Sequence, residues 1–454
     1  MTRGNIPRQL ITYSMPLLAG ALLQQLYNAV DAVVVGNFVG RDALAAVGST
    51  GALTQLLISF FMGMSSGASV LISRYFGAED DKKLSDTVHT SILLSLIIGA
   101  GLSVIGVAAS PLILRMMNTP DSMMPDAVKY LSIYFAGLLG LTVYNMGAAV
   151  LQSVGNSRYP LYFLIVSTVV NTIGDVVLVR VFGMGVAGAA WATIFAEALT
   201  AVLVVITLHR SHREYRLDFR KLRLNGAITK SIVALGLPGA IQGAIVSISN
   251  VMVQTYMNGL GAVAVAGHSA ANKLDNFLPL PVQTMALAVT TFVSQNLGAG
   301  EVKRARSGVK WSVIIAIVPT VILSVTVLIF HSQFLRIFSG DTEVLDYGWQ
   351  FMRVFAPFYF VLAGTQIIPG ALRGAGDVKT ATFASIISFV VLRQIYLFFM
   401  TKIRYTVFVV SLGYPATWTL CTIIVLVHYL RSNWSGFERA NKGTEEPEIT
   451  AQEV

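Results

Sequence analysis

Charged residues are scarce in this sequence. Asp, Glu, Lys and Arg make up 12% of its 454 residues, whereas 54% are hydrophobic and the mean hydropathy is +0.67. Soluble domains average about 25% charged residues. The shortage excludes a water-soluble globular protein and predicts a polytopic protein whose surroundings are the lipid bilayer. We expect the net charge of +9 to lie in cytoplasmic loops and not to bind nucleic acid.

Cysteine and enzyme motifs are also missing. Cys421 is the only cysteine, which excludes an intrachain disulfide. The chain has no HExxH, Walker A, CxxC or nucleotide-binding motif, and no nucleophile and base that would meet near one membrane interface. We therefore expect neither an enzyme nor an ATP-driven pump, and no cofactor. The opening residues MTRGNIPRQL lack a signal-peptide pattern, so the first apolar run should remain a membrane span.

Apolar runs of about 20 residues, enough to cross a bilayer, predict an all-α fold with twelve transmembrane helices. They lie near 11–37, 45–74, 88–114, 126–151, 160–181, 186–208, 232–257, 264–296, 309–334, 347–371, 380–401 and 406–430. The predicted domains are an amino-terminal lobe (1–208), a basic cytoplasmic linker (209–230), a carboxy-terminal lobe (231–431) and a cytoplasmic tail (432–454). The tail is acidic and weakly apolar, so we expect it to be disordered.

Positive charge sets the orientation. With the amino terminus in the cytoplasm, 22 of the 32 Lys and Arg residues fall in cytoplasmic segments and 8 fall outside. Lys273 and Arg393 lie within spans. Such an asymmetry predicts a multi-pass protein of a prokaryotic cell membrane with both termini cytoplasmic.

The two halves repeat in sequence. The segment at 73–78 recurs at 294–299 and the segment at 155–158 at 376–379, both at an offset of 221, while Pro16 matches Pro238 and Asn28 matches Asn250 at 222. Each half holds six predicted spans, so the halves start on the same side of the membrane. We expect two pseudo-symmetric six-helix bundles, a parallel repeat found in some transporters.

Polar residues interrupt three spans of the first half, each time on one helix face. They are Gln24, Asn28 and Asp31 in the first span, Thr168, Asn171 and Asp175 in the fifth, and Thr193, Glu197 and Thr200 in the sixth. A carboxylate in hydrocarbon costs about 2.5–3.5 kcal/mol on insertion scales. If the helices pack together, Asp31, Asn171, Asp175 and Thr193 form an oxygen-lined pocket that suits a hard cation. Two close carboxylates could instead share a proton.

Purely structural interpretations of these polar residues stay open. Asp31 could lie at a helix end among the headgroups, and the other polar groups could be unrelated helix–helix hydrogen bonds. The second half does not repeat the pattern: Val253 stands at the place of Asp31, and Leu392 at that of Asn171. Its charges within spans include Asp275 and Arg393, which could form a buried pair.

The sequence resembles the multidrug and toxic compound extrusion (MATE) family over roughly residues 5–430. The resemblance rests on Pro16 followed by YNAVD at 27–31, and on four further motifs: SRYFGA at 73–78, QSVGNSRYP at 152–160, NTIGD at 171–175 and GMGVAGAAWAT at 183–193. It implies two six-helix bundles around a central cleft. In one branch of the family a cation binds in the amino-terminal lobe, and the corresponding residues are Asp31, Asn171, Asp175 and Thr193. The acids of the other branch, on the seventh and tenth helices, have no counterpart here.

The resemblance implies a secondary antiporter that exports amphipathic, often cationic organic compounds in exchange for Na+ or H+. On this interpretation the four oxygen-bearing residues bind the coupling ion, with Na+ as the candidate metal. Gln24, Asn28, Glu197, Asp275 and Arg393 are candidates for the substrate cleft. We expect a monomer whose partners are small molecules and lipid. The alternative is a flippase for a lipid-linked oligosaccharide precursor, although such flippases usually need a cationic cavity, and here the candidates are mostly acidic.

Overall fold

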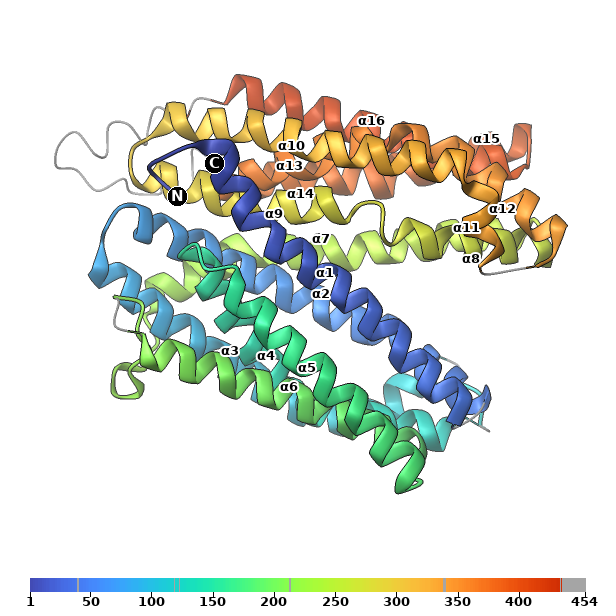
Figure 1. Cartoon of the computed structure of the whole chain (residues 1–454), viewed down its shortest axis with the longest axis horizontal. Coiled ribbons are helices and arrows are strands. Elements are labelled where there is room, and N and C mark those ends of the chain that lie inside the picture. Colours follow the sequence, from blue (N-terminus) through green and yellow to red (C-terminus); the bar gives the residue numbers. More distant parts are fainter. Residues whose placement is uncertain are drawn as a thin grey trace. The chain divides into compact units, whose positions relative to one another are not determined.

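The computed structural model describes residues 1–38, 41–117, 119–121, 123–211, 214–337, 340–432 and 434, without the side chains of 28–38, 41–53 and 55. Throughout these described ranges the regular structure is helical (Figure 1). The chain forms two compact units. The amino-terminal unit comprises Ala19–Ala240, and the carboxy-terminal unit comprises Met1–Leu18 together with Ile241–Val454.

The amino-terminal unit is built around α4, which packs against α2, α3 and α6, while α5 pairs with α6. Its elements are the later part of α1 (Ile6–Phe38), α2 (Arg41–Gly77), α3 (Asp81–Met116), α4 (Met124–Ser153), α5 (Arg158–Asp175), η1 (Val176–Val181), α6 (Gly185–Arg210), η2 (Phe219–Lys221) and the first part of α7 (Gly226–Asn258). η1 is a π-helix that continues α5, so the two together form the fifth predicted span.

The carboxy-terminal unit is built around α13, which packs against α9, α10 and α16. Its elements are the remaining parts of α1 and α7, then α8 (Ala262–Asp275), α9 (Leu280–Gly298), α10 (Val302–Ile329), α11 (His331–Arg336), α12 (Thr342–Phe355), η3 (Ala356–Phe358), α13 (Tyr359–Ala375), α14 (Val378–Ile386), η4 (Ile387–Leu392), α15 (Arg393–Ile403) and α16 (Val407–Arg431). η4, like η1, is a π-helix.

Each of the twelve predicted spans coincides with one helix or with consecutive helices. Among the described residues, ten helices are long and apolar enough to cross a membrane, or eleven when α8 and α9 count as one bent span. The remaining predicted span is α1. The eighth span differs from its prediction because it bends by 44° between α8 and α9, where Pro279 and Pro281 restrict the backbone and lack N–H donors.

Two helices are shared between the units. The unit boundaries fall after Leu18 in α1 and after Ala240 in α7, in each case two residues beyond a proline, Pro16 or Pro238. These boundaries cut helices, whereas the predicted domains are separated at the linker. The predicted domain boundaries at 208, 231 and 431 therefore describe a different division and stay a prediction.

The first part of α7 approaches α2 at backbone distance within the amino-terminal unit. A Cβ atom added at Gly63 would lie 2.5 Å from the backbone nitrogen of Ala240, and one at Gly67 would lie 2.5 Å from the carbonyl oxygen of Ile232. Gly63 and Gly67 are four residues apart on one helix face, the small-residue spacing that lets membrane helices pack closely.

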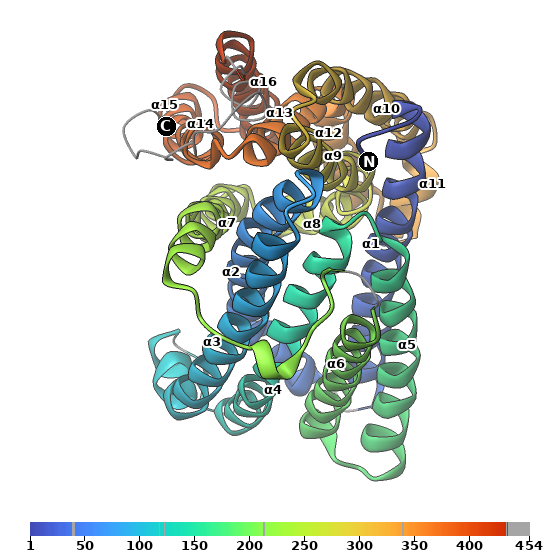
Figure 2. The same ribbon diagram turned by 90° about the vertical axis from the view of Figure 1, so that its left-hand side faces the viewer.

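The basic linker between α6 and α7 is attached to α3 (Figure 2). The backbone N–H of Asp218 donates to Nε2 of His89 over 3.0 Å, and Arg223 forms an ion pair with Asp86 at 2.8 Å. Leu217 is fully buried in the core of this unit. The linker is thus part of the packed structure of the amino-terminal unit.

Candidate cation site

Asn171 and Asp175 lie one turn apart on α5, and both are buried, with 1% and 0% of their surface exposed. Thr193 lies on α6, which packs along α5, and is 8% exposed. The four-residue spacing puts both α5 side chains on the face toward α6 because side chains at i and i+4 share a helix face. The structure therefore brings together three of the four residues predicted to bind a cation.

The side-chain amide of Asn171 links this cluster. In one orientation its Nδ2 lies 3.4 Å from Oγ1 of Thr193. In the other, Nδ2 donates to Oδ2 of Asp175 over 3.1 Å, while Oδ1 accepts from the backbone N–H of Thr193 and from the hydroxyl of Tyr27, both over 3.3 Å. We favour the second orientation because it satisfies both ends of the amide: its nitrogen faces an acceptor and its oxygen faces two donors.

Tyr27 joins the site from α1, and sequence analysis did not single it out as a site residue. Its hydroxyl lies 3.3 Å from the amide oxygen of Asn171 in the favoured orientation and 3.5 Å from Oγ1 of Thr193. A signal was present, because Tyr27 stands four residues before Asp31 and three after Gln24, on the same polar helix face. The aromatic ring concealed it, since a tyrosine in an apolar span usually fills space.

The structure describes less of the other α1 residues that were predicted for the cation site and the substrate cleft. The helix includes Asn28 and Asp31, but their side chains lie outside those that the structure describes. Gln24 is exposed at its surface. The participation of Asp31 in the cation site, and of Gln24 and Asn28 in a substrate cleft, remains a prediction.

Glu197 lies one helical turn after Thr193 on α6 and is partly buried. The phenol of Tyr134, on α4, lies in the electrostatic field of both Glu197 and Tyr27. Glu197 thus belongs to the same unit as the cluster, one turn away from it. No hydrogen bond between its carboxylate and the cluster occurs among the described residues.

Asp275 and Arg393 lie in the carboxy-terminal unit, apart from this cluster. The expectation that they could form a buried pair is not met in the described part of the chain. Asp275 accepts a hydrogen bond from the hydroxyl of Tyr359, and Arg393 donates to Asn250 and Thr417. Both charges are therefore held by neutral partners.

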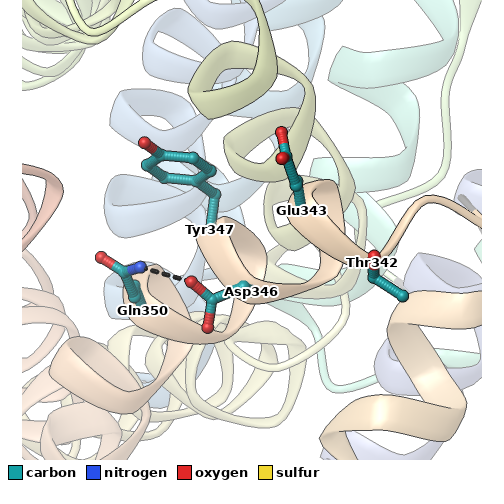
Figure 3. A pocket seen from close by; sticks show the side chains of 5 residues that line it. All are labelled: Thr342, Glu343, Asp346, Tyr347 and Gln350. Atoms are coloured by element: carbon teal, nitrogen blue, oxygen red, sulfur yellow. Dashed lines mark hydrogen bonds between the residues drawn. The ribbon is translucent and has the colours of Figure 1, made fainter.

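A hollow of about 410 Å³ lies against the exposed face of α12 (Figure 3). It is lined by Thr342, Glu343, Asp346, Tyr347 and Gln350, and Nε2 of Gln350 donates to Oδ2 of Asp346 over 2.7 Å. It includes none of the residues predicted for the cation site or the substrate cleft.

Comparison with known proteins supports a single family. The MatE family model matches residues 16–177 and 238–399, one match in each half. Two curated relatives from Bacillus subtilis align over most of both chains. The probable multidrug resistance protein YpnP is 29% identical over 86% of this chain and 88% of its own, and the probable multidrug resistance protein YoeA is 28% identical over 94% of each.

The fold also matches solved structures. The outward-facing structure of a multidrug resistance MATE family transporter of the MOP superfamily has a TM-score of 0.90 at 20% identity, covering 96% of this chain and 98% of the other. At that identity the match establishes the architecture alone. Two pseudo-symmetric bundles of membrane-spanning helices are thereby shown.

Proposed function

The chain belongs to the MATE family of transporters, and from this we propose that it is a secondary antiporter exporting amphipathic organic compounds in exchange for Na+ or H+. The relatives named as multidrug resistance proteins support drug-like substrates, often cationic ones. The proposal includes alternating access of the two predicted lobes, a monomer, a bacterial cell membrane and cytoplasmic termini. Gln24, Asn28, Glu197, Asp275 and Arg393 are proposed for the substrate cleft.

The observation that carries the ion coupling is the carboxylate of Asp175. It is 0% exposed and accepts a hydrogen bond from the amide of Asn171, which in turn contacts Thr193 and the hydroxyl of Tyr27. A buried carboxylate in a cluster with other oxygen-bearing side chains is a site that a small cation or a proton can complete. We propose that Asp31 supplies the second carboxylate from α1.

One coupled cation provides sufficient energy for export. Moving one charge through 100 mV releases about 2.3 kcal/mol, and each pH unit adds about 1.4 kcal/mol for a proton. Since about 1.4 kcal/mol corresponds to a tenfold concentration ratio, one ion concentrates a neutral substrate some tens-fold. The ion exerts this effect only because it binds one conformation of the protein more tightly than the other.

The test is transport of a fluorescent organic cation in membrane vesicles under an imposed Na+ or pH gradient. Asp31→Asn and Asp175→Asn keep the side-chain shape and remove the charge, so both proteins should still fold and insert. Removing a buried charge can even stabilise a protein modestly. We expect gradient-driven transport to fall to the level of empty vesicles in both variants, whereas substrate binding should weaken less.

The matched control is Asp126→Asn, which alters an exposed carboxylate in the first turn of α4 and should transport like the parent protein. Comparing a Na+ gradient at fixed pH with a pH gradient at fixed Na+ identifies the ion. Full transport by Asp31→Asn or Asp175→Asn at matched protein levels would rule out this coupling site. Flipping of a lipid-linked oligosaccharide in place of drug transport would overturn the function.

A further inference from the structure

Arg393 is a buried cation within a predicted membrane span, with 3% of its surface exposed. Its Nη1 donates to Oδ1 of Asn250 on α7 over 3.1 Å, and its Nη2 donates to Oγ1 of Thr417 on α16 over 3.2 Å. The guanidinium carbon lies 4.7 Å from the ring centre of Tyr414 and 5.5 Å from that of Phe389. One side chain therefore connects α7, η4, α15 and α16.

Within the described part of the chain, no acid forms an ion pair with Arg393. The ion pairs Lys83–Asp80, Arg223–Asp86 and His428–Asp377 lie elsewhere. The buried Nε of Arg393 has no hydrogen-bond partner in the described part of the chain. A guanidinium does not lose its proton in a protein, so neutral oxygens and aromatic faces hold a permanent cation here.

The repeat places this cation at the counterpart of the candidate cation site. Gly155 and Gly376 correspond at an offset of 221, just before α5 and α14. The π-helix η4, Ile387–Leu392, then intervenes before α15, and its wider turn takes up one extra residue. Along α15 the offset is therefore 222, and the counterpart of Asn171 is Arg393. Counting at a constant offset of 221 gives Leu392 instead.

Two neighbours of Arg393 also have counterparts in the first half of the chain. Asn250 matches Asn28 at the offset of 222. Along α6 and α16 the offset of 221 pairs the buried Val204 with the buried Val425, and in that register Tyr414 matches Thr193. In sequence, Arg393, Asn250 and Tyr414 thus correspond to Asn171, Asn28 and Thr193, and the arginine has replaced an amide.

We propose that Arg393 is a tethered cation. In the carboxy-terminal unit its guanidinium permanently occupies the position that, in the amino-terminal unit, an exchangeable cation takes. The guanidinium holds α7 against α15 and α16 at all times, so this cluster does not respond to ion gradients. The comparison with an exchangeable ion rests on the proposed function, whereas the role of Arg393 as a resident cation can be tested without any transport.

Removing the side chain should leave a site that a free guanidinium fills. In Arg393→Ala, the oxygens of Asn250 and Thr417 and the rings of Phe389 and Tyr414 remain. Cys421 is a built-in reporter because it is 0% exposed on α16, one turn beyond Thr417, and the chain has no other cysteine. The measurement is the rate at which a small thiol reagent modifies Cys421 in the purified full-length protein.

We expect Cys421 in Arg393→Ala to react about tenfold faster than in the parent protein, in line with the loss of one or two buried hydrogen bonds. Millimolar methylguanidinium should restore most of the protection, whereas tetramethylammonium, a cation without N–H donors, should not. The matched control Arg353→Ala removes an exposed arginine of the same unit and should leave the rate unchanged under all conditions.

Two further variants distinguish the effect of the charge from the effect of side-chain packing. They also keep the proposal testable if Arg393→Ala does not fold. Arg393→Lys keeps a cation, and Arg393→Gln keeps a polar side chain without charge. Protection of Cys421 in the lysine variant and its loss in the glutamine variant support the proposal. Equal protection in both, or an alanine variant that methylguanidinium does not affect, would overturn it. Because no outcome depends on transport, failure here leaves the proposed antiport untouched.

Discussion

At the scale of single residues, the candidate cation site depends on the side chains that hold the amide of Asn171 against a buried carboxylate. The hydroxyl of Tyr27 is the component most easily removed without a change of shape. It lies 3.3 Å from the amide oxygen of Asn171 in the favoured orientation and 3.5 Å from Oγ1 of Thr193. It therefore helps to fix the amide that donates to Asp175.

We predict that Tyr27→Phe weakens ion coupling without abolishing it. One buried hydrogen bond contributes about 0.5–1.5 kcal/mol, so the ion concentration for half-maximal transport should rise roughly two- to tenfold. The measurement is transport rate against Na+ concentration or pH in vesicles. Tyr162→Phe, at an exposed tyrosine of α5, is the control and should leave the curve in place. An unchanged curve for Tyr27→Phe would exclude this hydroxyl from the site.

Sequence analysis identified part of this cluster for a physical reason. Asn171 and Asp175 share a helix face at a spacing of four, and polar groups on one face of an apolar helix indicate a buried partner. The same argument missed Tyr27, because an aromatic ring does not interrupt an apolar pattern. It also aligned Leu392 with Asn171, because counting residues assumes uniform helices and cannot detect the π-helix η4.

At the scale of helices, the contact between α2 and α7 depends on missing side chains. A Cβ at Gly67 would lie 2.5 Å from the carbonyl oxygen of Ile232 and 2.6 Å from the nitrogen of Gly236. These neighbours are backbone atoms, so they cannot move aside as a flexible side chain would. The two helices must separate if Gly67 gains a methyl group.

We predict that Gly67→Ala destabilises the protein by about 1–3 kcal/mol, the usual cost of overpacking. Gly101→Ala is the matched control, since a Cβ at that position on α3 meets nothing within 4 Å. Alanine favours the helix over glycine by up to about 1 kcal/mol, so the control should be neutral or stabilising. Thermal unfolding of the purified variants measures both, and equal unfolding temperatures would contradict the close contact.

The linker helix η2 has a charge-dependent cap. The carboxylate of Asp218 accepts the backbone N–H of Arg220 over 3.0 Å, and this hydrogen bond is the largest cause that lowers the pKa of Asp218 below its ordinary value. Because the folded pKa lies below the unfolded value of about 3.9, the cap is fully effective above that value. It is lost as the pH falls through the folded pKa.

We therefore predict that backbone hydrogen exchange at Arg220, corrected for its intrinsic rate, is constant from neutral pH to about pH 5 and rises only in stronger acid. Asp218→Ala should exchange faster than the parent protein at every pH above the folded pKa of Asp218. Asp218→Asn keeps an equivalent capping oxygen and should remain protected even in strong acid. Loss of protection in the parent protein already near neutral pH would show that the cap does not hold the linker.

The helices themselves were largely predictable because apolar length is the dominant signal in a membrane protein. The break between α8 and α9 was not predicted, although Pro279 and Pro281 mark it, since prolines are tolerated inside membrane helices. The division of α1 and α7 between two units could not be predicted either. It depends on which neighbours each half of a helix contacts, and hydropathy does not contain that information.

At the scale of the whole molecule, the orientation follows from the distribution of basic residues, and it can be tested with single cysteines. In a Cys421→Ser background we predict that Ile403→Cys, at the end of α15, reacts with a membrane-impermeant maleimide on intact cells. Phe219→Cys, in the linker, should react only after lysis. Both side chains are well exposed, 76% and 54%, so access is decided by the membrane. The reverse pattern would invert the predicted topology.

The sharing of α1 between the units has a consequence for the order of synthesis. Residues 1–18 leave the ribosome before the amino-terminal unit, yet they belong to the carboxy-terminal unit, where the hydroxyl of Tyr13 meets that of Thr291, 278 residues later in the chain. At about 5–20 residues per second, roughly 15 to 55 s pass between the two. This segment therefore passes that interval without its partner on α9, and release of a nascent chain before α9 leaves Tyr13 without this contact.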